Sequence, residues 1–172
     1  MKCNELVKNG KPFALSLLTV DTHFGNKLLP EAKREFGDIR DFIMLQSQLI
    51  ADFVNWILHQ PFGKNTVIVI LGDHNMMTTK LGNIPLPEQE RRVFNCIVNS
   101  KSGKKLGRDC PAAMVDVAPT ILEALGVDWS SHAFGIGRSL YNSEKTCLEK
   151  YGFEKFQEET SKRSRKYREL IE

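Results

Sequence analysis

Acidic and imidazole side chains follow two separate apolar runs of this sequence, and they are its strongest candidates for chemistry. Asp73 and His74 come directly after the run at residues 66–71, and His23 follows the run at residues 12–20. Carboxylate and imidazole together suit a hard or borderline divalent cation. The residue types alone also allow a plainer interpretation, in which each group caps a strand end or satisfies a local hydrogen bond.

Two strands and a helix must position these groups. The run at residues 66–71 contains four β-branched aliphatic side chains, which predicts a strand buried on both faces. Residues 38–59 carry the apolar stripe of an amphipathic helix of about six turns. Strands joined through such a helix run parallel, so their carboxyl ends share one sheet edge, where ligands gather. The pattern therefore predicts a βαβ unit that brings His23 toward Asp73 and His74.

The downstream segments complete an α/β pattern. Residues 75–87 have the composition of a long loop, and residues 93–99 predict a third strand. Residues 116–126 predict a short helix in which Asp116 accepts the free amides of the first turn. The strongly charged residues 142–172 predict a peripheral helical tail.

Composition sets the frame for these elements. A chain of 172 residues with 41% hydrophobic and 26% charged residues predicts one globular domain. A net charge of +3 is too small to indicate nucleic acid or a lipid surface, and no apolar run reaches the length of a membrane span. The four cysteines lack the spacing of a structural zinc site, while Cys110 and Cys147 could pair only in an oxidising compartment.

Several motifs in a fixed order carry a further interpretation. They are Thr19-Val20-Asp21-Thr22-His23, Leu71-Gly72-Asp73-His74, Asp116-Val117-Ala118-Pro119-Thr120 and Gly137-Arg138-Ser139-Leu140. As a set they resemble the C-terminal half of the sulfatase-like alkaline phosphatase superfamily, and above all its membrane phosphoglycerol transferases, which include the lipoteichoic acid synthases. The resemblance covers about residues 12–141. It implies a partial alkaline phosphatase-like fold, a mostly parallel sheet flanked by helices.

The resemblance also implies site residues. In that family the strand-end Asp and His bind one divalent cation (manganese, magnesium or zinc), and these positions correspond to Asp73 and His74. The histidine that binds the substrate phosphate corresponds to His23. A metal and an imidazole on one sheet edge can neutralise the charge that develops on a transferring phosphoryl group. His59 and His132 match no motif, so ordinary surface roles are expected for them.

The sequence departs from the family in one respect. Family enzymes use a threonine nucleophile and an acidic metal ligand from an N-terminal half of the catalytic domain, whereas Thr19, Thr22, Thr78 and Thr79 match no nucleophile motif. Cys110-Pro111-Ala112 does not fit the C-x-P-x-R of true sulfatases either. The resemblance therefore implies that the whole chain is the C-terminal portion of a larger enzyme and that its catalytic nucleophile lies upstream.

The expected function is that of one part of a metal-dependent phosphoglycerol transferase. The complete enzyme would move a phospholipid head group to a glycan or polymer hydroxyl through a covalent threonine intermediate. The open alternatives are a sulfatase, phosphoethanolamine transferase or phosphodiesterase of the same superfamily, or a non-catalytic binding domain. The expected partners are the missing half of the catalytic domain and, through an exposed sheet edge, a second copy of the chain. The parent would lie in the cell membrane with its catalytic domain outside the cytoplasm, and the isolated chain would be soluble.

Overall fold

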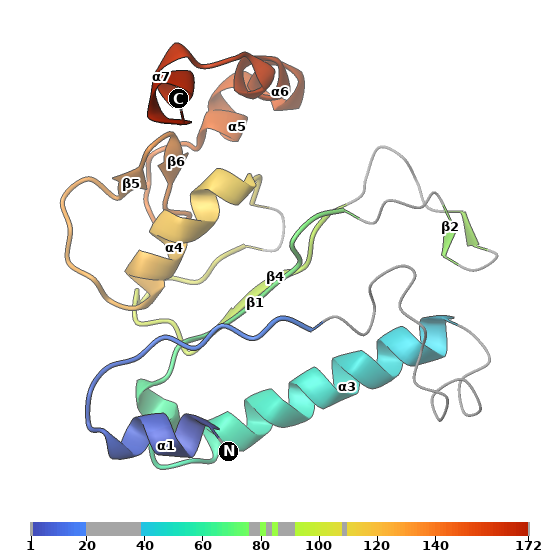
Figure 1. Cartoon of the computed structure of the whole chain (residues 1–172), viewed down its shortest axis with the longest axis vertical. Coiled ribbons are helices and arrows are strands. Elements are labelled where there is room, and N and C mark those ends of the chain that lie inside the picture. Colours follow the sequence, from blue (N-terminus) through green and yellow to red (C-terminus); the bar gives the residue numbers. More distant parts are fainter. Residues whose placement is uncertain are drawn as a thin grey trace. The chain divides into compact units, whose positions relative to one another are not determined.

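A computed structural model describes residues 2–19, 39–75, 80–81, 84–85, 92–107 and 110–171 of the chain. The chain divides into two compact units, residues 1–96 and residues 97–172. Both units contain helices and short strands (Figure 1). The helices and strands up to the division are α1 (Lys2–Lys8), α3 (Ile39–Leu58), η1 (Gly63–Asn65), β1 (Ile68–Leu71), β2 (Lys80–Leu81), β3 (Ile84–Pro85) and β4 (Asn95–Val98), which crosses the division. Those beyond it are η2 (Met114–Asp116), α4 (Val117–Ala124), β5 (Ala133–Phe134), β6 (Gly137–Arg138), α5 (Cys147–Tyr151), α6 (Phe153–Ser161) and α7 (Arg165–Ile171).

Helix α3 is the long element of the first unit (Figure 1). Its length agrees with the helix predicted over residues 38–59. Ile57 is buried, and the Trp56 ring lies between Phe53 and Phe62, with ring centroids 6.1 and 6.2 Å away. The apolar stripe of α3 therefore packs the helix end onto the turn that leads into β1.

Strand β1 confirms the strand predicted around residues 66–71, and β4 confirms the third predicted strand. The two are neighbours in a two-stranded sheet. The Gly72 N–H donates to the Phe94 carbonyl at 2.8 Å, so the carboxyl end of β1 lies beside the amino end of β4, as in an antiparallel pair. The pairs β2–β3 and β5–β6 are also antiparallel. The expected mostly parallel sheet is thus not found among the strand pairs that the structure describes.

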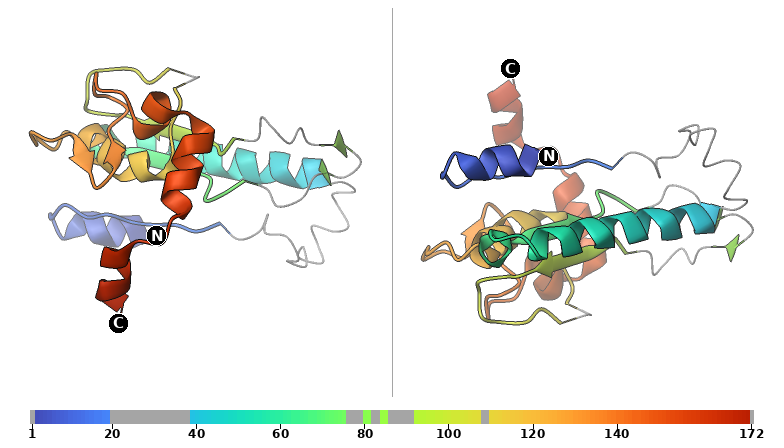
Figure 2. Two further views of the ribbon diagram at one scale, coloured as in Figure 1. Left: turned by 90° about the horizontal axis from the view of Figure 1, so that it is seen from above. Right: turned by 90° about the horizontal axis from the view of Figure 1, so that it is seen from below.

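The strand predicted at residues 12–20 is wrong over its described part. Residues 12–19 form neither helix nor strand and are exposed, and Val20 lies outside the described residues. The segment leaves α1 as an elongated trace (Figure 1 and Figure 2). An apolar run forms a strand only when a neighbouring strand accepts its backbone hydrogen bonds. The predicted βαβ unit therefore lacks its first strand.

Helix α4 is the centre of the second unit and packs against β6. Ala124 and Tyr141 are buried there together with the polar side chains of Thr120 and Ser139. The helix ends as its sequence predicts, because Gly126 adopts a φ of 76° and its N–H donates to Glu123 O at 2.9 Å. The next N–H reaches back to Leu122 O at 3.1 Å, which completes a Schellman motif.

The predicted helical tail consists of three short helices, α5, α6 and α7. Thr146 caps α5, since its Oγ1 accepts the Glu149 N–H at 3.1 Å while its own N–H donates to the Glu149 carboxylate at 2.7 Å. Gly152, with a φ of 78°, then separates α5 from α6. In the part of the chain that the structure describes, no helix combines the length and apolar character that a membrane crossing requires.

Candidate functional site

Asp73 and His74 follow the end of β1, where the sequence predicts the site. Gly72 makes this exit closely packed, because a Cβ there would lie 3.2 Å from Val93 Cγ1 and 3.5 Å from the Phe94 nitrogen. The strand end therefore lies directly against the backbone that leads into β4, and the next two side chains emerge beyond it.

The two side chains contact each other in a defined way. One Asp73 oxygen, Oδ1, accepts the backbone N–H of His74 at 2.9 Å, and the other, Oδ2, lies 3.5 Å from His74 Nε2. His74 Nδ1 lies 2.8 Å from the Asn75 carbonyl oxygen. A carbonyl only accepts, so this contact places a ring proton on Nδ1, and Nε2 is the ring nitrogen that faces the Asp73 carboxylate.

This geometry fits two adjacent ligands of one divalent cation. Two atoms at the corners of a tetrahedral site with metal–ligand distances of about 2.1 Å lie about 3.4 Å apart. The Oδ2–Nε2 distance of 3.5 Å agrees with that value. Ligating histidines also usually donate their other N–H to a carbonyl or carboxylate, as His74 does to Asn75.

The pair is an open and incomplete site. The side chains of His74 and Asp73 are 56% and 76% exposed. No group of three or more potential ligands occurs among the residues that the structure describes. His23, predicted to face the pair, lies outside those residues, as do Asp21, Thr22, Thr78 and Thr79. The convergence of His23 with Asp73 stays a prediction.

Asp116 has a role that the sequence analysis missed. It was expected to cap α4, yet its side chain makes no cap hydrogen bond to that helix. Instead the buried carboxylate accepts the N–H of Ala113 at 2.9 Å and the N–H of Arg138 at 2.8 Å. Asp116 thus ties the loop before α4 to the Gly137-Arg138-Ser139-Leu140 motif. An acid between two valines was the only signal for burial, and it does not reveal a partner 22 residues away.

Thr120 makes the same connection one turn further along α4. Its Oγ1 donates to the Asp116 carbonyl at 2.5 Å and accepts the N–H of Leu140 at 3.0 Å. Ser139 is fully buried, and its hydroxyl accepts the Tyr141 N–H at 3.2 Å. Hydrogen bonds therefore join the two sequence motifs of this unit, and the polar residues of both motifs stabilise the fold.

The remaining histidines have local partners. His59 Nδ1 lies 2.7 Å from the carbonyl oxygen of Asn55, one helical turn earlier. His132 has a φ of 48° and lies 3.1 Å from a Glu123 carboxylate oxygen. These contacts agree with the ordinary roles expected for both residues.

The cysteines that could have paired are free thiols. Cys147 Sγ donates to the Ile136 carbonyl at 3.3 Å. Burial raises the pKa of the Cys110 thiol above its ordinary 9.0, and the carboxylates of Glu149 and Asp116 raise it further.

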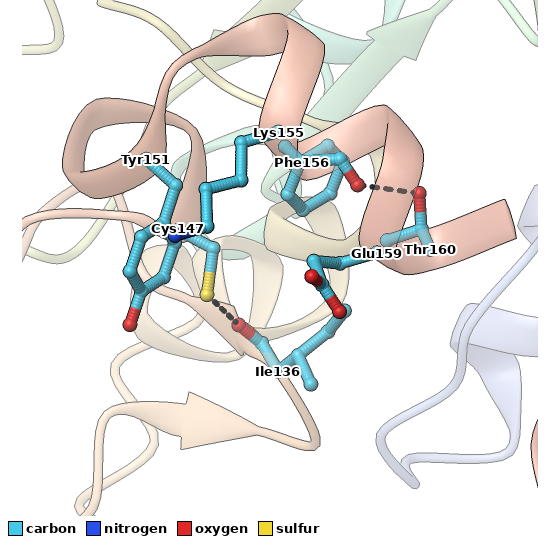
Figure 3. Close-up of a pocket in the computed structure, with 7 residues that line it drawn as sticks. All are labelled: Ile136, Cys147, Tyr151, Lys155, Phe156, Glu159 and Thr160. Atoms are coloured by element: carbon cyan, nitrogen blue, oxygen red, sulfur yellow. Dashed lines mark hydrogen bonds between the residues drawn. The ribbon is translucent and has the colours of Figure 1, made fainter. Parts of the chain in front are cut away.

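A cavity of about 330 Å³ lies in the second unit. Figure 3 shows the side chains around it, which come from the β5–β6 turn, α5 and α6: Ile136, Cys147, Tyr151, Lys155, Phe156, Glu159 and Thr160. The Lys155 ammonium lies 5.6 Å from the centre of the Tyr151 ring, in a cation–π contact. None of the predicted site residues lines this cavity, and its mostly apolar wall offers no nucleophile paired with a base.

Sequence comparison places the chain beside a group of curated bacterial proteins named phosphoglycerol transferase I. That of Xanthomonas campestris pathovar campestris is 32% identical over 151 residues, which cover 78% of this chain and 20% of the relative. The Xanthomonas axonopodis protein is 30% identical over 147 residues (81% of this chain), and the Citrobacter koseri protein is 30% identical over 146 residues (80% of this chain). The chain spans about one fifth of the length of these relatives. No family model matches the chain. No solved structure matches it either.

Proposed function

Because this chain is a relative of the sulfatase-like phosphoglycerol transferases, we propose that it supplies the metal-binding part of such a transferase. In this proposal Asp73 and His74 are two ligands of a divalent cation, and His23 binds the phosphate of the substrate. The Asp73–His74 geometry carries the proposal, because Asp73 Oδ2 and His74 Nε2 lie 3.5 Å apart.

The residues of this chain would each perform a separate task. His74 donates a hydrogen bond from Nδ1 to the Asn75 carbonyl. This bond fixes the orientation of the ring and leaves Nε2 as the nitrogen that can bind the metal. Asp73 supplies a carboxylate oxygen and, through its other oxygen, holds the His74 backbone in place. A bound Mn²⁺, Mg²⁺ or Zn²⁺ would neutralise negative charge on the transferring phosphoryl group.

In this proposal, the other catalytic groups lie in the part of the relatives that does not align with this chain. We propose that a threonine nucleophile and further ligands come from the four fifths of the relatives outside the matched stretch. The donor would be a phospholipid head group and the acceptor a glycan or polymer hydroxyl. The complete enzyme would then lie in the cell membrane with its catalytic domain outside the cytoplasm.

A zinc titration of the isolated chain tests the metal site. Nuclear magnetic resonance of the imidazole nitrogens should show a shift at His74 Nε2 on addition of Zn²⁺. Binding should be weak, because only two ligands are present among the described residues. Asp73→Ala should reduce the shift and His74→Ala should abolish the binding.

His59 is the matched control for this titration. Its ring is also held through Nδ1 by a carbonyl, at 2.7 Å, but it forms no ion pair with a carboxylate among the described residues. His59→Ala should therefore leave the titration unchanged. Equal shifts at both histidines, or tight binding that survives the double substitution of Asp73 and His74 by alanine, would contradict the assignment.

A chimera tests the activity. This chain replaces the matched stretch of the Xanthomonas campestris protein, and transfer of phosphoglycerol is then measured with and without Asp73→Ala. The activity of the Asp73→Ala chimera should be at least about a hundredfold lower, because loss of a metal ligand removes charge stabilisation in the transition state. Full activity of the Asp73→Ala chimera would count against the proposal.

A further inference from the structure

The positive charge of this chain is concentrated near its C-terminal end. Residues 162–168, called the basic segment below, hold five lysines and arginines and no acidic residue. The net charge of the whole chain is only +3, so the remaining residues together carry a net charge of −2. The small overall charge is thus the sum of a strongly basic segment and a weakly acidic remainder.

The cations of the basic segment are exposed, and part of their charge is unpaired. Lys162 pairs with Glu159 at 2.7 Å and with Glu158 at 3.5 Å, and Arg165 pairs with Glu169 at 3.1 Å. The nearest carboxylates on α6 and α7 therefore already have cationic partners. Three further cations of the segment form no ion pair with any residue that the structure describes: Arg163, Lys166 and Arg168. These three are available to anionic groups outside the chain.

Exposed apolar side chains accompany this charge in the second unit. The cavity beside α6 has a mostly apolar wall that includes Ile136 and Tyr151, which are 54% and 56% exposed (Figure 3). The Lys155 ammonium lies 5.6 Å from the centre of the Tyr151 ring, so a cation and an exposed aromatic ring lie together there. A lysine can rest its aliphatic stem on such an apolar surface while its charge reaches a phosphate. The cavity wall is therefore amphipathic.

A basic run together with exposed aromatic and aliphatic side chains is typical of a surface that lies on an anionic membrane. A nucleic acid would also attract the basic segment, but its phosphate backbone gives Ile136 and Tyr151 no apolar phase to enter. We propose that this part of the second unit docks on a bilayer of anionic phospholipids. The basic segment contacts the head-group phosphates, and Ile136 and Tyr151 enter the interface with the cavity turned toward the acyl chains.

This docking goes beyond the proposed transfer reaction, because it needs neither the metal nor a phosphoglycerol donor. The probe is therefore a vesicle that contains phosphatidylserine, whose head group carries no phosphoglycerol, and the assay contains a chelator. The titration of His74 is measured without vesicles. Failure of the docking and failure of the metal site are thus distinguishable.

Vesicle sedimentation with the complete 172-residue chain tests the docking. The chain should bind vesicles of mixed phosphatidylserine and phosphatidylcholine at least about tenfold more tightly than vesicles of phosphatidylcholine alone. Added salt should weaken this binding, because it screens the attraction between the basic segment and the head groups.

Two triple variants separate the basic segment from charge in general. Replacing the three unpaired cations by glutamine (Arg163→Gln, Lys166→Gln, Arg168→Gln) should weaken binding about a hundredfold. The control removes the same charge from exposed lysines elsewhere (Lys8→Gln, Lys11→Gln, Lys105→Gln). It should stay within about fivefold of the parent chain, because those lysines are not part of the proposed contact.

A substitution in the cavity wall tests the apolar part. Tyr151→Ser keeps the charge of the chain and should weaken binding about tenfold. Met44→Ser, at a side chain that is 70% exposed in α3, is the control and should bind as the parent does. Alkylation of Cys147, which lines the cavity, should slow when vesicles are added, while alkylation of Cys96 in β4 should keep its rate.

Several results would overturn the proposal. One is no binding to the phosphatidylserine vesicles, or equally tight binding to phosphatidylcholine alone. Another is an equal loss of binding in the two triple variants. A third is tighter binding to a DNA duplex than to the vesicles, with Tyr151→Ser leaving both unchanged, since a nucleic acid would then be the partner.

Discussion

The buried carboxylate of Asp116 accepts the backbone N–H of Arg138 at 2.8 Å, across 22 residues of sequence. Its other oxygen accepts the N–H of Ala113. One side chain thus satisfies two part-buried backbone donors. This arrangement makes Asp116 the residue on which the geometry of the second unit depends most directly.

Asp116→Asn should destabilise the chain by about 2–3 kcal/mol, because one of the two N–H groups would meet an amide NH₂ in place of an acceptor. Chemical denaturation followed by circular dichroism measures the change. Asp128→Asn, at an exposed position in the same unit, is the matched control and should stay within about 0.5 kcal/mol of the parent. Equal effects at both positions would show that the Asp116 hydrogen bonds do not stabilise the fold.

Thr120→Val should cost about 1–2 kcal/mol, because valine keeps the shape but leaves the Leu140 N–H without its acceptor. Thr160→Val provides the control. The Thr160 hydroxyl also donates to a carbonyl one turn earlier, Phe156 O at 2.8 Å, but it is exposed. The difference between the two variants in thermal melting isolates the bond to Leu140, and identical melting curves would contradict its importance.

Gly137→Ala should disrupt the second unit. A Cβ at this position would lie only 1.8 Å from the Val115 carbonyl oxygen, so the backbone around Asp116 would have to move. We expect a loss of about 3 kcal/mol or more in the free energy of unfolding. Gly107→Ala meets nothing within 4 Å and should be nearly neutral. A Gly137→Ala variant as stable as the Gly107→Ala variant would show that the close approach does not occur in solution.

Cys110 should react slowly with iodoacetamide at neutral pH. Burial, aided by Glu149 and Asp116, raises the pKa of its thiol above 9.0, and the thiolate is the reactive form. The alkylation rate, followed by mass spectrometry, should therefore reach half of its maximum only above pH 9. Glu149→Gln should move that midpoint to lower pH, and a midpoint below 9.0 in the parent chain would contradict the prediction.

The same pKa shift affects stability. The unfolded chain releases the Cys110 proton at a lower pH than the folded chain does. The contribution of the Cys110 thiol to the free energy of unfolding is therefore fully present below about pH 9. It falls as the pH rises through the folded-state pKa. Cys110→Ala should remove this part of the alkaline loss.

The sequence predicted the elements that depend on local pattern. The apolar stripe of α3 and the β-branched run of β1 appear where expected, as does the glycine end of α4 at Gly126. In each case the determining residues lie within one helix or one strand and its flanks. The position of Asp73 and His74 directly after β1 followed from the same local logic.

The predictions that were wrong concern residues whose structure depends on partners distant in sequence. Residues 12–19 have the pattern of a strand, but a strand needs a neighbour, and no pattern within the segment says whether one is present. Asp116 has the sequence position of a helix cap, yet its acceptor oxygens turn to Ala113 and Arg138. The Arg138 loop lies beside it only after folding, so local sequence could not distinguish the two roles.

The packing of the two tryptophans gives each unit its own optical signal. Trp56 lies against Phe53 and Phe62 in the first unit, and Trp129 lies 6.4 Å from the His132 ring in the second. The indole N–H of Trp129 is buried without a hydrogen-bond partner in the described part of the chain, so water reaches it only on unfolding. In single-tryptophan variants, the emission of each ring therefore reports one unit. Coincident denaturation curves would mean that the two units form one cooperative structure, whereas separate curves would mean that either half can melt while the other stays intact.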